Sequence, residues 1–302
     1  MTDRSLDSGP MALSVTGAAK RYASGFTLSD VTFDLPAGYV MGLIGPNGAG
    51  KSTLIKLILN MIRSDVGTIE SFGRDSVRDE ETFKADLGVV FDSSFLLELW
   101  TIRQAERAVS VFYPAWDSAL FSSYLDRFGL DPRKKIKELS RGMQMKLMLS
   151  MALSHDAHLL ILDEPTSGLD VLARDELMEI LREYVADGDR SVIFSTHITS
   201  DLEHIADFIT YITGGRLYYS GPKDEFEDAF RIVRGGPCDL EGAIEASALG
   251  VRRFDTGFEA LMRTETTGRL PAGLMVEIPG IDDIIRLTNG RAEAGSSHEK
   301  EV

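Results

Sequence analysis

Unbroken apolar runs recur along this 302-residue chain, and four of them end at residues that can handle phosphate, metal or water. Parallel strands buried on both faces have this pattern, and in open α/β sheets ligands gather at their carboxyl ends. The runs are 40–44 before Gly45, 89–91 before Asp92, 159–162 before Asp163, and 192–194, which leads through two residues to His197. The pattern predicts a parallel sheet with a functional edge.

Other periodicities predict the elements around this sheet. Residues 26–35 carry alternating apolar groups, which indicates antiparallel strands with one wet face. Two short apolar segments flank Gly214-Gly215, which is typical of a hairpin. Between about residues 95 and 155 the spacing becomes helical, which predicts a helical subdomain inserted into the sheet domain.

The chain is predicted to divide into three parts. The sheet domain with its helical insertion covers residues 1–230, and a small α/β extension with several glycine joints covers residues 231–290. The polar, glycine-containing residues 291–302 have the composition of a disordered tail.

Composition and charge argue against several classes of protein. Apolar residues make up 43% and charged residues 26% of the chain, as in ordinary globular proteins, and the net charge of −15 argues against a nucleic-acid partner. The single cysteine, Cys238, excludes an internal disulfide and fits a reducing cytosol. The polar first ten residues do not resemble a secretory signal, and no apolar run is long enough to cross a bilayer. If the protein works at a membrane, we expect another chain to cross it.

A glycine-rich loop supplies the strongest chemical signal. Residues 45–52, GPNGAGKS, fit the spacing G-x-x-x-x-G-K-[ST] between a predicted strand and a predicted helix, a context that argues against a chance match. The glycines let backbone N–H groups converge on phosphate, Lys51 would reach the β- and γ-phosphates of ATP, and the Ser52 hydroxyl would bind Mg²⁺. The candidate nucleotide-binding residues are Gly45, Asn47, Gly48, Gly50, Lys51, Ser52 and Thr53.

Two adjacent carboxylates follow the third apolar run. Side chains of neighbouring strand residues diverge, so Asp163 can hold Mg²⁺ through water while Glu164 faces the γ-phosphate as a general base. A pair that merely caps the strand end is the alternative. The sequence PTSGLD that follows at 165–170 argues against it.

In combination, these motifs resemble the ATP-binding subunit of an ABC transporter over about residues 12–225. GPNGAGKST resembles Walker A, LSRGM at 139–143 the ABC signature, LLILDEP Walker B, and SGLD the D-loop. The resemblance implies a P-loop NTPase core with a mixed, mostly parallel sheet, an antiparallel β part and an inserted helical subdomain. It also implies an ATPase whose cofactors are ATP and Mg²⁺.

The resemblance implies roles for further residues. Tyr22 matches the aromatic residue that stacks on adenine, and His197 matches the switch histidine that contacts the γ-phosphate. Ser140 and the Gly142 backbone would reach the nucleotide of a partner subunit, and Asp170 would lie at the dimer seam. Two such subunits, identical or similar, would sandwich two ATP molecules and drive a membrane permease from the cytoplasmic face of the membrane.

Two departures from the family pattern stand out. Asp92 occupies a position where the family usually has a glutamine that links Mg²⁺ and the attacking water to the permease contact. An aspartate can still serve as a metal ligand and catalytic group there but adds repulsion near phosphate, so we expect altered coupling, not lost coupling. Arg141 and Met143 replace the usual Gly and Gln, a form that resembles exporter subfamilies. Arg141 either contacts phosphate or the partner subunit, or is simply solvated.

The apolar segment after Asp92 has two interpretations. Ordinary core is one, given how often such residues are buried. A groove for the permease's coupling helix is the other, because the resemblance puts that groove here. The residues are Phe95, Leu96, Leu97, Leu99 and Trp100.

Three other functions fit these motifs less well. A soluble ABC ATPase acting on ribosomes or DNA usually has two ATPase domains in one chain or a long insertion, and this chain has one set of motifs. A small GTPase would need a guanine-recognition motif of the Asn-Lys-x-Asp type, which is not found. Intact Glu164 and His197 argue against a non-hydrolysing regulator. The resemblance implies that the permease, and not this chain, mainly selects the transported substrate.

Overall fold

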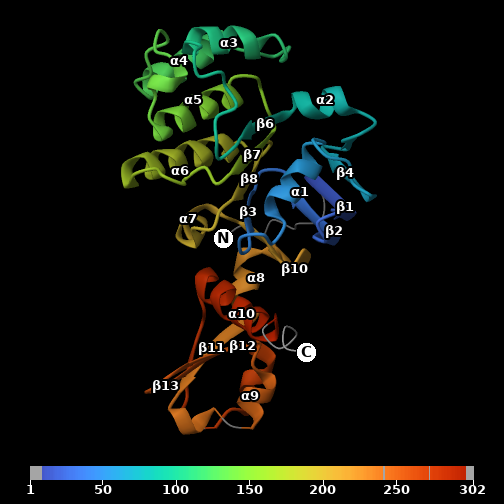
Figure 1. Ribbon diagram of the computed structural model, residues 1–302, viewed down its shortest axis with the longest axis vertical. Coiled ribbons are helices and arrows are strands. Elements are labelled where there is room, and N and C mark those ends of the chain that lie inside the picture. Colours follow the sequence, from blue (N-terminus) through green and yellow to red (C-terminus); the bar gives the residue numbers. More distant parts are fainter. Residues whose placement is uncertain (1–8, 241, 272, 297–302) are drawn as a thin grey trace.

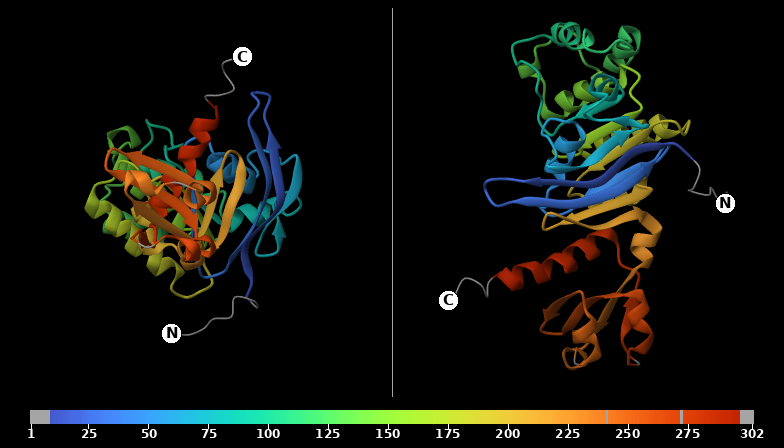
Figure 2. Two further views of the ribbon diagram at one scale, coloured as in Figure 1. Left: turned by 90° about the horizontal axis from the view of Figure 1, so that it is seen from below. Right: turned by 90° about the vertical axis from the view of Figure 1, so that its right-hand side faces the viewer.

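The computed structural model describes residues 9–240, 242–271 and 273–296 (Figure 1). In this part of the chain a ten-stranded sheet forms the main body, in the order β5-β4-β1-β2-β10-β9-β3-β8-β7-β6. The molecule is elongated, with a helical subdomain at one end and a smaller C-terminal unit at the other (Figures 1 and 2). None of the helices described combines the length and the apolarity needed to cross a bilayer.

The four predicted apolar runs form neighbouring parallel strands, which confirms the central prediction. They are β3 (Val40–Ile44), β8 (Ser191–Ser195), β7 (Leu159–Asp163) and β6 (Leu87–Val90). Side chains of β7 alternate between two cores: Leu160 and Leu162 face one, and Leu159 and Ile161 the other. Burial on both faces explains why these strands are apolar without a break.

Different layers cover the two faces of the parallel strands. Residues of α5 (Arg141–Leu153), α6 (Val171–Val185) and α7 (Thr199–Ile205) lie in one core. The other core contains α1 (Lys51–Ile58) and the antiparallel part of the sheet. That part consists of β1 (Met11–Arg21), β2 (Thr27–Pro36), β4 (Val66–Ser71) and β5 (Arg74–Asp75), with α2 (Glu80–Ala85) after it. Much of β2 alternates buried and exposed residues as predicted.

The late hairpin is also confirmed. β9 (Phe208–Thr213) pairs antiparallel with β10 (Arg216–Pro222), and β9 continues the parallel sheet on the free side of β3. Its turn contains Gly215 at φ +73°, and a Cβ there would lie 2.0 Å from the carbonyl oxygen of Thr27. A side chain would collide with the neighbouring strand, so the turn requires glycine.

The inserted region is helical, as predicted. It contains α3 (Ile102–Ser110), α4 (Ser118–Arg127), the 3₁₀ turn η1 (Ile136–Glu138) and α5 (Arg141–Leu153). Thr101 and Gln104 form a reciprocal capping box that starts α3, and Asp117 accepts hydrogen bonds from the first turn of α4. These caps fix where the helices begin in a region of weak periodicity.

The C-terminal unit follows α8 (Lys223–Asp228) and has its own four-stranded antiparallel sheet, in the order β12-β13-β11-β14. Its strands are β11 (Phe230–Gly235), β12 (Gly250–Phe254), β13 (Gly257–Arg263) and β14 (Met275–Glu277). Its helical elements are η2 (Pro237–Asp239), α9 (Ala243–Ser247), η3 (Thr264–Arg269) and α10 (Ile281–Ser296).

One predicted boundary is wrong. The disordered tail was expected from residue 291, but α10 continues to Ser296; residues 297–302 lie outside the described residues. The start of α10 explains how the helix is held: Ile281 and Ile284 are fully buried in the core that also contains Leu202 and Ile205 of α7. This contact joins the C-terminal unit to the helix that follows His197.

Candidate active site

The phosphate loop connects β3 to α1 and depends on glycine at two positions. Gly45 has φ +152°, and a Cβ there would lie 2.1 Å from the carbonyl oxygen of Ile212. Gly50 has φ +116° and is the N-cap of α1, which begins at Lys51. Side chains at these positions would be strained or would clash. Glycine therefore allows the backbone to turn tightly around an open space at a helix N-terminus.

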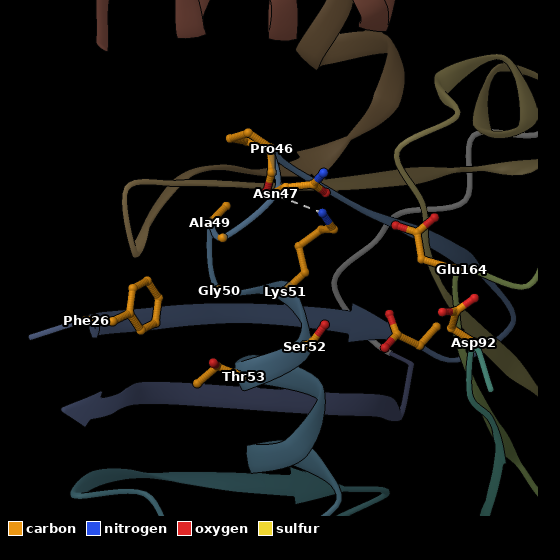
Figure 3. Close-up of a pocket in the computed structure, with 12 residues that line it drawn as sticks. Phe26, Pro46, Asn47, Ala49, Gly50, Lys51, Ser52, Thr53, Asp92 and Glu164 are labelled. Atoms are coloured by element: carbon orange, nitrogen blue, oxygen red, sulfur yellow. Dashed lines mark hydrogen bonds between the residues drawn. The ribbon is translucent and has the colours of Figure 1, made fainter. Parts of the chain in front are cut away.

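Lys51 is the cation of this loop. The residue is only 7% exposed, and its ammonium group donates hydrogen bonds of 2.7 Å to the carbonyl oxygen of Gly45 and 3.5 Å to that of Pro46, the second of which is drawn in Figure 3. Burial lowers the pKa of Lys51, while the nearby carboxylates of Glu164 and Asp163 raise it. These carboxylates favour the charged form of a lysine that is held next to the loop and ready to bind an anion.

A cavity of about 540 Å³ lies over the loop, a size that suits a small-molecule ligand. Figure 3 shows Phe26 at one end of this cavity and Asp92 and Glu164 at the other. The cavity therefore offers an aromatic surface, then backbone N–H groups and Lys51, then carboxylates. The lining residues are Phe26, Pro46, Asn47, Gly48, Ala49, Gly50, Lys51, Ser52, Thr53, Asp92, Asp163 and Glu164.

The structure brings together Glu164 and His197, which lie 33 residues apart. The Glu164 Oε2 atom is 2.6 Å from His197 Nδ1 and also accepts a hydrogen bond from the backbone N–H of His197. An ionised carboxylate has no proton to give, so the ring N–H donates. Glu164 itself has φ +52°, a strained conformation for a non-glycine residue and one that clusters at functional sites.

Asp163 lies beside Glu164 and is also partly buried. Burial raises the pKa of Asp163, and the charges of Glu164 and Asp92 raise it further, although Lys51 opposes them. Three carboxylates thus share one side of the cavity. Their mutual repulsion favours binding of a cation between them and the phosphates of a ligand.

The donor set fits magnesium. Ser52, Asp163 and Asp92 all line the cavity and supply hydroxyl and carboxylate oxygens, the ligands that Mg²⁺ prefers. In the described residues no three His, Cys, Asp or Glu side chains form a metal-binding group by themselves. Such a site suits an ion that completes its shell with water and substrate phosphates, as Mg²⁺ commonly does.

The aromatic residue in the cavity differs from the one singled out in the sequence. Phe26 lines the cavity, whereas Tyr22 does not, and the ring centroids of these two residues lie 6.2 Å apart. A backbone hydrogen bond of 2.9 Å from Tyr22 to Phe26 closes the turn between β1 and β2 and sets the two rings side by side. The role of Tyr22 in stacking on adenine stays a prediction, and Phe26 is a residue that the sequence reading missed.

The predicted signature and D-loop residues are among those that do not line the chain's own cavity. Ser140 is the N-cap of α5, where its hydroxyl accepts a hydrogen bond from Met143, and Gly142 follows in the first turn. Asp170 is the N-cap of α6 and accepts from Ala173. Ser140 and Asp170 are exposed to solvent. The sequence correctly placed Ser140 at the start of a helix.

The Arg141 side chain is about half exposed but is paired within its own chain. Its guanidinium forms an ion pair with Asp92 and donates a hydrogen bond of 3.2 Å to the Ser167 hydroxyl. The two departures from the family pattern at 92 and 141 are therefore in direct contact within one chain. Their separation of 49 residues gives no local signal of this contact.

The apolar segment after Asp92 is only partly core. Leu96 is 8% exposed and Trp100 packs against the core, but Phe95, Leu97 and Leu99 are 59%, 56% and 68% exposed. The core interpretation is therefore wrong for these three. Beside Phe95 lies a hollow of about 270 Å³, lined by Leu59, Met61, Lys84, Leu87, Val89, Phe91, Phe95 and Tyr113.

Replacing Asp163 with Asn tests the electrostatic cost of this site. A raised carboxyl pKa means that the folded chain holds its proton more tightly than the unfolded chain, so wild-type stability falls as the pH rises through that raised pKa. The neutral amide escapes this penalty. We expect nucleotide-free Asp163→Asn to unfold at a higher temperature than wild type at pH 7 and to lose this advantage at pH 4.

Thermal unfolding at both pH values measures the effect, with Asp126→Asn on the exposed surface of α4 as the control. A destabilised Asp163→Asn variant at pH 7, or a gain that does not change with pH, would contradict the assignment.

Comparison with known sequences gives one family. A family model described as ABC transporter matches residues 28–167. The Nod factor export ATP-binding protein I of Rhizobium johnstonii is 30% identical over 93% of this chain and 96% of its own length. The daunorubicin resistance ATP-binding protein DrrA3 of Streptomyces coeruleorubidus is 32% identical over 86% of this chain and 85% of its own. The lantibiotic transport ATP-binding protein SrtF of Streptococcus pyogenes is 31% identical over 72% of this chain and 93% of its own length.

Comparison with solved structures leads to the same family. An ATP-binding subunit of an ABC transporter superimposes with a TM-score of 0.66 at 30% identity, over 72% of this chain and 92% of its own. A dimeric ATP-binding cassette in a post-hydrolysis state with ADP and Pi has the same fold, with a TM-score of 0.63 at 21% identity over 70% of this chain and 98% of its own. With the phosphate loop, the paired carboxylates and the signature helix in place, the chain belongs to the ABC transporter family and is one of its ATP-binding subunits, an ATPase.

Proposed function

We propose that this chain hydrolyses Mg²⁺-ATP in sites shared between two subunits and thereby powers export through a membrane permease. One observation carries the proposal: Lys51 and the Glu164–His197 pair lie close together at one cavity. A phosphate-binding cation next to a base with its own hydrogen-bonding partner is what ATP hydrolysis requires.

The residues divide the work of hydrolysis. The loop N–H groups and Lys51 bind the β- and γ-phosphates. Ser52, Asp163 and Asp92 would hold Mg²⁺, which would neutralise phosphate charge when bound. Glu164 accepts the proton of the attacking water. His197 donates to Glu164 through Nδ1 and keeps the carboxylate pointed at the γ-phosphate position.

Sharing of the site between two subunits follows from the residues outside the cavity. Ser140, Gly142 and Asp170 carry signature and D-loop motifs but do not line the cavity of their own chain. Ser140 and Asp170 are exposed, and the N-terminal end of the 13-residue helix α5 adds a partial positive charge behind Ser140. These features suit contact with the nucleotide of a second, identical or similar subunit.

Export and a cytoplasmic position at the membrane are supported by the relatives and by the surface. Among the relatives compared, those named for a process act in Nod factor export, lantibiotic transport and daunorubicin resistance. The exposed side chains of Phe95, Leu97 and Leu99, next to an apolar hollow, offer a docking surface for a cytoplasmic helix of a permease.

Replacing Glu164 with Gln tests the assigned base. The amide keeps the size of the side chain but cannot take a proton, so turnover should fall about 10²–10⁴-fold while ATP still binds. Steady-state ATPase rates and equilibrium ATP titration measure the two effects. Glu179→Gln on the exposed side of α6 should match wild type in both. Normal turnover in Glu164→Gln would refute the assignment.

The docking surface is tested by the double replacement Phe95→Ser and Leu97→Ser. Loss of a central apolar anchor typically costs 2 kcal/mol or more, so we expect at least a roughly tenfold loss of chain bound to membranes that contain the co-expressed permease. ATPase activity without the permease should persist. Val276→Ser with Ile278→Ser, on the equally exposed C-terminal unit, is the control. Equal membrane binding by both double variants would contradict the assignment of the docking surface to these residues.

A further inference from the structure

Asp92 and Arg141 are a matched pair of unusual residues. The family resemblance predicts a neutral glutamine at 92 and a glycine at 141, and this chain has an acid and a base there instead. The two side chains form an ion pair that links the loop after β6 to the first residue of α5. The acid beside the phosphate site thus has a cation as its direct partner.

The guanidinium is held by more than one segment. Arg141 also donates to the Ser167 hydroxyl at 3.2 Å, in the loop that leads from β7 to Asp170. Its methylene stem runs against Gly168, where a Cβ would lie 3.1 Å from the Arg141 Cδ atom. These contacts place the Arg141 Nη2 atom, which donates to both Asp92 and Ser167, in front of the Asp92 carboxylate.

The charge balance of the cavity shows what the pair does. Asp92, Asp163 and Glu164 all line the cavity that receives phosphate, whereas Lys51 is the one cationic residue among its lining residues. The uncompensated charge of Asp92 would repel the phosphates of a nucleotide. Arg141 forms an ion pair with Asp92 and so supplies a positive charge, although Arg141 itself does not line the cavity.

We propose that Arg141 is a positioning residue that neutralises Asp92 and so permits an acidic residue beside the phosphate cavity without loss of nucleotide affinity. The inference rests on the proposed binding of ATP at this cavity. Both side chains are about half exposed, at 53% and 52%, so water and salt reach the pair and it can open when Asp92 turns toward a metal ion.

A double-mutant cycle tests this coupling. The full-length wild type, Asp92→Asn, Arg141→Gln and the double variant are titrated with ATP in EDTA at low salt, and thermal unfolding verifies that each chain is folded. Removing Arg141 alone should weaken ATP binding about 5–20-fold, as expected for one uncompensated charge near the site. In the Asp92→Asn background the same replacement should change affinity by less than about twofold, because no charge remains to be neutralised.

Arg133→Gln, at an exposed arginine of the same subdomain, controls for the general loss of positive charge and should stay within about twofold of wild type. An equal loss in both backgrounds, or no loss from Arg141→Gln in either, would overturn the inference, since a merely structural tether would change unfolding but not this coupling. A wild type that fails to bind ATP would instead contradict the proposed function. The two failures are therefore distinguishable.

Discussion

The parallel alignment of β3, β8, β7 and β6 is the constraint on which the site depends. Because these strands run the same way, the phosphate loop, Asp163, His197 and Asp92 all emerge at one edge of the sheet. Burial of the sheet between two layers holds the ends of these strands rigidly. The loop can then present N–H groups to phosphate at the start of α1, with the carboxylates across the cavity.

Several features of the site are energetically unfavourable in the chain without a ligand. Three carboxylates share the cavity, burial raises the pKa of Asp163, and Glu164 has a left-handed backbone conformation. Each of these is unfavourable in the free chain and becomes useful when phosphate and a cation arrive. The pairing of Asp92 with Arg141 relieves part of the repulsion. The site is therefore balanced by charges contributed from both the sheet and the helical subdomain.

Local patterns in the sequence predicted the central strands, the phosphate loop, the hairpin and the helical insertion, since each depends on neighbouring residues. Contacts between distant residues could not be predicted in this way. The pair of Arg141 and Asp92, and the position of Phe26 in place of Tyr22, depend on how separate elements pack. The end of α10 was missed because residues 291–296 have the polar composition of a tail, while the start of the helix is anchored by Ile281 and Ile284.

The central claim is that one chain holds only part of each catalytic site, since Ser140 and Gly142 do not line its own cavity. Mixing two inactive variants, Lys51→Ala and Ser140→Arg, tests this most directly. In a mixed pair one site combines the intact phosphate loop of one chain with the intact signature of the other. ATPase activity should then appear only on mixing, up to roughly a quarter of the wild-type rate for random pairing of equal amounts. A mixture as inactive as its components, or full activity of Ser140→Arg alone, would contradict it.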